Sequence, residues 1–131
     1  MIWSIAIGSA VGGVSRYLLG LFIQQSTGIG FPLGTLVINI SGSLLLGFLL
    51  RWGLITADAT PELRAMLTTG FCGGYTTFST FSYETATLLE DGWYGRAALY
   101  VSLSLVLSLA GVFLGFHLAR TLFAVRERLP L

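Results

Sequence analysis

The residues with the most distinctive chemistry lie between Gly70 and Thr85, where glycines, hydroxyl side chains and aromatic rings precede the first charge, Glu84. Phe78 and Phe81 are three residues apart and therefore share one face of a helix. The edge of a phenylalanine ring carries positive partial charge, so two rings turned edge-on to a lumen would attract an anion without binding it strongly. Core packing is the alternative role for such a pair. Nearby hydroxyl groups favour the anion-facing role, namely those of Thr76, Thr77, Ser79, Thr80 and Ser82.

Two further stripes of polar side chains recur at intervals of four residues, so each would lie along one face of a helix. The stripes are Thr35, Asn39 and Ser43, and Tyr100, Ser104 and Ser108. Uncharged donors along a route suit an ion that must be desolvated gently and released quickly. A serine in a membrane helix usually bonds to its own backbone, whereas Asn39 requires a partner in the bundle or in a wet cavity.

The composition places these stripes in a membrane protein. Of the 131 residues, 54% are hydrophobic and 10% are charged, whereas soluble domains carry about a quarter charged residues. The charges leave four long apolar intervals, and a bilayer core needs about 20 apolar residues in a helix. The sequence therefore predicts an all-α membrane protein with one four-helix transmembrane domain over residues 1–131. Its helices are expected at about 2–23, 33–53, 62–90 and 95–122.

Several classes of site are disfavoured by the composition. A net charge of +1 argues against nucleic-acid binding, which needs a basic face. Cys72 is the only cysteine and His117 the only histidine, so one chain cannot form a disulfide, a cysteine cluster or a multi-histidine metal site. There is no lysine and hence no Gly-x-x-x-x-Gly-Lys loop for ATP.

The third helix is expected to be interrupted near Gly73 to Thr77. Paired glycines followed by paired β-branched residues suit a helix interior poorly, each glycine costing about 1 kcal/mol relative to alanine. Backbone groups freed there must be satisfied by protein, ion or water. Interrupted helices whose carbonyls converge at mid-membrane form ion sites in transport proteins. The alternative is an intact helix whose Ser and Thr hydroxyls bond back to its own carbonyls.

Two charges, Arg16 and Glu84, fall inside the predicted spans. Counting residues along each helix puts both roughly 8 to 10 Å from the same membrane face. A charge at the bilayer centre is costly, so their similar depth indicates either an ion pair or a shared vestibule.

Glycine pairs spaced four apart predict close helix packing in lipid. They are Gly8 and Gly12, Gly30 and Gly34, Gly70 and Gly74, and Gly111 and Gly115. Four helices can hardly surround a solvated pathway unaided, so a transport function predicts an oligomer, most simply a homodimer.

The arginines are distributed unequally between the two sides of the predicted bundle. The side that holds both termini would carry Arg51, Arg64, Arg120, Arg126 and Arg128. The opposite side would carry Arg96 and the deep Arg16. By the positive-inside rule this predicts a multi-pass membrane protein with cytoplasmic termini.

The run from Gly73 to Phe81, with an asparagine in the preceding helix and a chain of this length, resembles the Fluc (CrcB) fluoride channels. The run reads Gly-Gly-Tyr-Thr-Thr-Phe-Ser-Thr-Phe, and the resemblance covers nearly the whole chain. It implies a fluoride-selective channel that exports toxic fluoride passively across the cytoplasmic membrane, without an organic cofactor. It also implies an antiparallel homodimer with two pores and a structural sodium ion at its centre. An antiparallel dimer requires both insertions, whereas the arginine bias predicts mainly one.

The resemblance also implies roles for particular residues. Main-chain oxygens of Gly73 and Thr76 would hold the sodium ion. Fluoride would pass the rings of Phe78 and Phe81, with Asn39 as a donor. The remaining pore residues are expected among the hydroxyl side chains, namely Thr35, Thr80, Tyr100, Ser104 and Ser108.

Three other classes of protein fit the sequence less well. A small multidrug-type, proton-coupled transporter would need a membrane acid in its first helix, where this chain has Arg16. A membrane enzyme would need grouped acids, histidines or cysteines, and Glu84 alone does not suffice. A non-transporting membrane subunit would need neither the broken helix nor the polar stripes. The expected partners are therefore fluoride, the lipid bilayer and a second copy of the chain.

Overall fold

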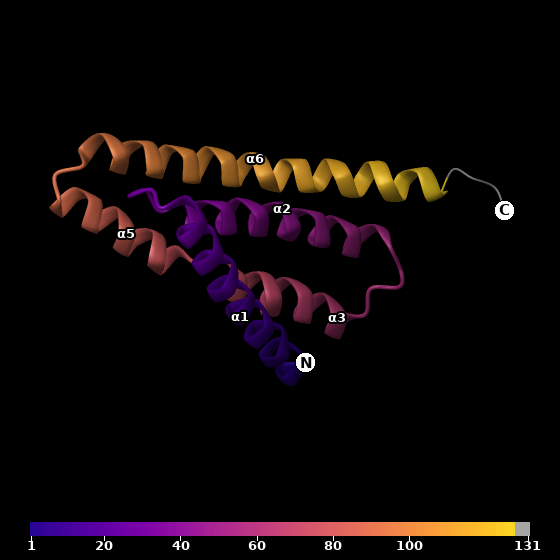
Figure 1. Cartoon of the computed structure of the whole chain (residues 1–131). Coiled ribbons are helices and arrows are strands. Elements are labelled where there is room, and N and C mark those ends of the chain that lie inside the picture. The colour runs from indigo at the N-terminus through magenta and orange to yellow at the C-terminus, as the bar shows by residue number, and fades with distance from the viewer. Residues whose placement is uncertain (128–131) are drawn as a thin grey trace.

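The computed structural model describes the backbone of residues 1–127 and the side chains of residues 1–123, and this part of the chain contains helices and no strands. Three of its helices are long and apolar enough to cross a membrane (Figure 1). These are α1 (Ile2–Thr27), α2 (Leu33–Ile55) and α6 (Tyr94–Glu127). The third predicted span is divided into α3 (Pro61–Ala65), the π-helix η1 (Met66–Cys72), α4 (Gly73–Tyr75) and α5 (Phe78–Glu90).

The helix ends carry local stop and start signals. Gly28 closes α1 in the left-handed conformation with φ of 58°, which glycine adopts without steric cost. The hydroxyl of Thr60 accepts a hydrogen bond from the amide of Leu63 and caps α3. The helices α1 and α2 extend past their predicted ends at 23 and 53, and α6 extends past 122.

The predicted interruption of the third span is present, but it lies after the glycines. Gly73 and Gly74 are helical, whereas Thr76 and Thr77 are extended, with φ, ψ of −83°, 159° and −152°, 119°. The β-branched threonines favour extended backbone. Gly74 serves a different purpose, since a side chain there would collide with the carbonyl of Ser9 in α1. The intact-helix alternative is therefore wrong.

The helices form two layers that cross near the break (Figure 1). In one layer α2 and α6 lie side by side and run in the same direction, with Gly47 against Val112 and Gly115 against Leu44. In the other layer α1 packs on η1 and α4, where the two glycine pairs Gly8 and Gly12, and Gly70 and Gly74, face the partner backbone. Gly30, by contrast, precedes α2 and belongs to no packed helix.

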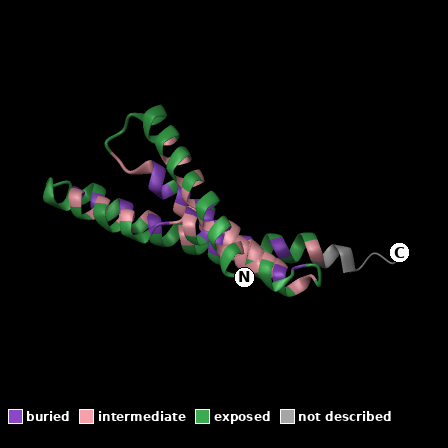
Figure 2. Cartoon of the chain, turned by 90° about the horizontal axis from the view of Figure 1, so that it is seen from below, coloured by how far each residue is buried: buried purple, intermediate pink, exposed green. Residues whose placement is uncertain are grey.

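Much of the apolar surface remains exposed (Figure 2). Along α1, Trp3 and Phe22 are among the exposed large side chains, and along α6 so is Phe113. Contiguous exposed apolar surface of this kind is typical of a membrane-embedded or partner-covered protein. Of the residues in the arginine-bias argument, Arg126 and Arg128 lie outside the described side chains.

Candidate functional site

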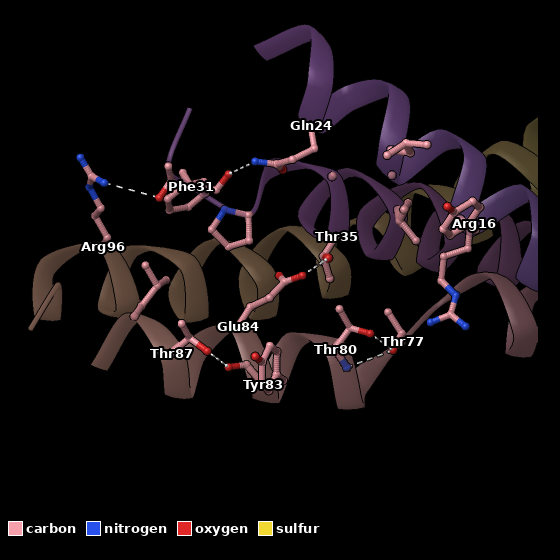
Figure 3. A pocket seen from close by; sticks show the side chains of 18 of the residues that line it. Arg16, Gln24, Phe31, Thr35, Thr77, Thr80, Tyr83, Glu84, Thr87 and Arg96 are labelled. Carbon is pink, nitrogen blue, oxygen red and sulfur yellow. Dashed lines mark hydrogen bonds between the residues drawn. The ribbon is translucent and has the colours of Figure 1, made fainter. Parts of the chain in front are cut away.

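A carboxylate and two hydroxyls from three helices meet at one point of the bundle. Glu84 of α5 accepts a hydrogen bond from the hydroxyl of Thr35 in α2 at 2.7 Å (Figure 3). Its other oxygen accepts from the hydroxyl of Tyr100 in α6 at 2.8 Å, and Tyr100 is fully buried. The carboxylate is therefore held in a fixed position between α2 and α6.

Arg16 and Glu84 do not form the ion pair that was one of their two expected arrangements. No nitrogen of Arg16 comes within 4.0 Å of the Glu84 carboxylate in the described structure. In Figure 3 the guanidinium of Arg16 points toward the segment of Thr77, whereas Glu84 points toward Thr35. Both nevertheless line one cavity of about 810 Å³ that opens between α1 and α5. The expectation of similar depth therefore placed the two side chains in the lining of the same cavity, but it did not make them partners.

The side chain of Asn39 pairs with the backbone at the helix break. Its Nδ2 donates to the carbonyl of Thr77 at 3.0 Å, and its Oδ1 accepts from the amide of Thr77 at 2.9 Å. This reciprocal pair supplies the partner that a membrane-embedded asparagine requires. One Nδ2 hydrogen remains for a further acceptor.

Thr77 is the N-cap residue of α5, and its hydroxyl caps the helix. It accepts a hydrogen bond from the amide of Thr80 at 3.2 Å and donates to the Thr80 hydroxyl at 3.1 Å. A side-chain acceptor at this position satisfies one of the amides that a helix start leaves unpaired. Thr77 was not among the expected site residues, although its position beside the paired glycines is the signal that marks it.

These side-chain hydrogen bonds leave two main-chain carbonyls without their α-helical donors. In an α-helix the Gly73 carbonyl would receive the amide of Thr77, but that amide donates to Asn39. The Thr76 carbonyl would receive the amide of Thr80, but that amide donates to the Thr77 hydroxyl. The break thus releases from α-helical bonding the two carbonyls that were expected to hold a cation.

A second cavity, of about 360 Å³, brings the two polar stripes together with the phenylalanine pair. Its polar lining comes from Asn39, Ser43, Thr76, Thr77, Ser104 and Ser108, and its aromatic lining from Phe78 and Phe81. The oxygen of Ser104 is buried and has no hydrogen-bond partner in the described structure. Buried polar groups are normally paired, so an unpaired hydroxyl beside this cavity can serve a ligand.

The two phenylalanine rings differ in their surroundings. Their centroids are 5.6 Å apart with the planes inclined by 41°. Phe81 also contacts the ring of Tyr100, at 5.2 Å between centroids, whereas Phe78 is 77% exposed. Core packing therefore does not describe Phe78.

The expected pore residues are thus divided between two cavities. Thr35 and Thr80 line the larger cavity with Glu84, while Asn39 and the serines of α6 line the smaller one. Thr77 lines both cavities and stands where they approach each other. Tyr100 joins the two sets through its hydroxyl bond to Glu84 and its ring contact with Phe81.

Taken together, the apolar helices, the broken third span and the polar cavities define a small multi-pass membrane protein with the features of a channel or transporter. The chain belongs to the CrcB-like family. The family described as "CrcB-like protein, Camphor Resistance (CrcB)" matches residues 3–116.

Curated relatives cover nearly the whole chain. A protein of Geobacter sulfurreducens is 48% identical over 121 residues, which are 92% of this chain and 98% of the relative. A protein of Agrobacterium fabrum is 45% identical over 119 residues, 91% of this chain and 95% of the relative. Both are named "Fluoride-specific ion channel FluC". The family is therefore one of channels and not of enzymes, as the sequence predicts.

Proposed function

We propose that this chain is a fluoride-selective channel that exports toxic fluoride passively across the cytoplasmic membrane. The observation that carries the proposal is the smaller cavity, where the unpaired hydroxyl of Ser104 stands close to Asn39, Ser108 and two phenylalanine rings. Fluoride is a small anion that accepts hydrogen bonds strongly, and neutral donors can replace its water without trapping it. The names of the relatives point to the same ion.

A passive pathway suffices for export. Fluoride enters cells from acidic media as neutral HF and dissociates at cytoplasmic pH, so the anion accumulates inside. A membrane potential that is negative inside then drives it out, at about 2.3 kcal/mol per charge for each 100 mV. No ATP-binding loop is required, which agrees with a sequence that has no lysine.

The channel is proposed to be an antiparallel homodimer with two pores. A single copy leaves the smaller cavity open beside the exposed ring of Phe78, and a second copy would cover that ring. The glycine-lined contacts of α1 lie within the chain, so the exposed apolar faces remain available to a partner or to lipid. A twofold axis near the break would also bring two copies of the same backbone segment together.

Dual orientation is the testable consequence of an antiparallel dimer. A cysteine introduced as Leu131→Cys in a Cys72→Ser background should be labelled by a membrane-impermeant reagent from both sides of the membrane. Half of the copies would present their C-terminus outside. The control is the Cys72→Ser protein, which should not be labelled. Labelling from the cytoplasmic side alone would contradict dual topology and agree with the arginine bias instead.

The dimer centre is proposed to hold a structural sodium ion through the carbonyls of Gly73 and Thr76. Both are released from α-helical bonding, and a side chain added at Gly73 would meet no atom within 4 Å, so the backbone there is open to a ligand. Two copies would offer four neutral oxygens, which suit a monovalent cation better than a divalent one that recruits carboxylates. The nearest acid in sequence, Glu84, is already bonded to two hydroxyls.

Liposome efflux followed with a fluoride electrode tests both parts of this proposal. Purified protein should release fluoride but not chloride from loaded vesicles. Flux should fall strongly when a large organic cation replaces sodium on both sides, and should recover when sodium is added back. Vesicles that release no fluoride would reject the channel. Full flux after verified removal of sodium would reject only the cation requirement.

A further inference from the structure

The hydrogen bonds around the helix break fix the orientation of the peptide group between Thr76 and Thr77. In a trans peptide the carbonyl and the amide point in opposite directions. The amide of Thr77 points toward α2, because it donates to Asn39 at 2.9 Å. The carbonyl of Thr76, which belongs to the same peptide group, therefore points away from α2.

Asn39 acts on a second carbonyl at the same time. By taking the amide of Thr77, it removes the α-helical donor of the Gly73 carbonyl, three residues before Thr76. Its second bond, from Nδ2 to the Thr77 carbonyl, also fixes the peptide group between Thr77 and Phe78. By holding the backbone of a residue 38 positions away in sequence, a single side chain in α2 thus orients the Thr76 carbonyl and releases the Gly73 carbonyl.

We infer that Asn39 is a positioning residue for the sodium site. Its two hydrogen bonds to the backbone of Thr77 hold the carbonyls of Gly73 and Thr76 in the arrangement that binds the ion. The inference rests on the proposed function, because the cation itself belongs to that proposal. Asn39 stands on the cavity side of the break, with the Thr76 carbonyl directed to the opposite side. The same side chain therefore links the cation site mechanically to the cavity that contains Phe78 and Ser104.

The test measures sodium binding through thermal stability, independently of flux. A ligand that binds only the folded protein raises its unfolding temperature in proportion to the logarithm of its concentration above Kd. Unfolding of purified protein is followed as sodium chloride replaces the chloride of a large organic cation at constant ionic strength. For Asn39→Ala, the sodium concentration at which the unfolding temperature begins to rise should be about tenfold higher, as expected for losing one or two hydrogen bonds that shape the site.

The matched control is Ser43→Ala. Ser43 lies one turn along the same face of α2 and lines the same cavity, but it makes no hydrogen bond to the break in the described structure. It should leave unchanged the sodium concentration at which the unfolding temperature begins to rise. A merely structural role of Asn39 would lower the unfolding temperature equally at all sodium concentrations and would not move this onset concentration.

If Asn39→Ala does not fold, Asn39→Asp takes its place, because it keeps an acceptor for the Thr77 amide; it replaces the Nδ2 donor by a second carboxyl oxygen. Since the bond that directs the Thr76 carbonyl is kept, the sodium concentration at which the unfolding temperature begins to rise should not increase by more than about threefold. A wild-type protein without any response to sodium would reject the sodium site of the proposed function. A normal wild-type response with an unchanged onset concentration in Asn39→Ala, or a lost response in Asn39→Asp, would reject the positioning role alone.

Discussion

Replacing Phe81 by isoleucine should lower fluoride flux by at least about tenfold while the protein remains folded. Isoleucine keeps most of the apolar volume but removes the polarised aromatic ring from the lining of the smaller cavity. A loss of about 1.4 kcal/mol in the stabilisation of the passing ion corresponds to a factor of ten in rate. Phe78→Ile should act in the same direction, since both rings line this cavity. The measurement is fluoride efflux from vesicles that contain equal amounts of folded protein.

The same substitution at Phe113 is the control. Phe113 is 67% exposed on α6 and contacts Phe116, but it lines neither cavity. Phe113→Ile should therefore leave fluoride flux within about twofold of the wild-type value. Wild-type flux from well-folded Phe78→Ile and Phe81→Ile proteins would exclude the rings from ion conduction, and the role of Phe81 would then be packing against Tyr100.

The helical spans and the position of the break could be predicted because their signals are local. An apolar interval of membrane-spanning length and a pair of β-branched residues act within one segment of chain. Even so, the break lies at Thr76 and Thr77 and not at the glycines, because Gly74 is required for contact with α1. Composition alone cannot distinguish a glycine that interrupts a helix from a glycine that lets the backbone of a neighbouring helix approach closely.

The partners within the site could not be predicted in the same way. An asparagine within a membrane helix needs a hydrogen-bond partner. The sequence does not say which carbonyl of the bundle that partner is, because only the packing of the helices brings Thr77 next to Asn39. The depth of Glu84 suggested Arg16 as a partner, because depth along a helix is countable from the sequence. The direction in which a side chain leaves the helix also matters, and it turns Glu84 toward Thr35 instead.

The π-helix shows the same limit more strongly. Nothing in the sequence of residues 66–72 distinguishes η1 from an ordinary α-helix, yet this segment has the wider turns of a π-helix where it meets α1. Its carbonyls at Met66 and Phe71 lie directly against Gly8 and Gly12. The Cα hydrogens of these glycines can contact carbonyl oxygens at short range, as at other close helix pairs. The spacing of the glycines predicted a close helix contact, but it could not predict which backbone segment they contact.

This contact makes Gly12→Ala one of the most damaging small substitutions that we expect outside the cavities. A methyl group at this position would overlap the carbonyl oxygen of Phe71 and crowd the amide of Tyr75, both of which are backbone atoms that cannot rotate away. Overpacking of this kind typically costs about 1 to 3 kcal/mol. The unfolding temperature of the purified protein should fall by several degrees or more, and Gly12→Val should prevent folding.

Gly95→Ala separates this steric effect from the general effect of glycine in a helix. Gly95 lies in the first turn of α6, and a side chain there would meet no atom within 4 Å. Alanine favours helix over glycine by up to about 1 kcal/mol, so Gly95→Ala should leave stability unchanged or raise it. Equal unfolding temperatures for Gly12→Ala and the wild-type protein would mean that α1 and η1 can move apart at little cost. Because α4 and the break directly follow η1 in the chain, a stable Gly12→Ala protein would also show that the break does not depend on this contact for its position.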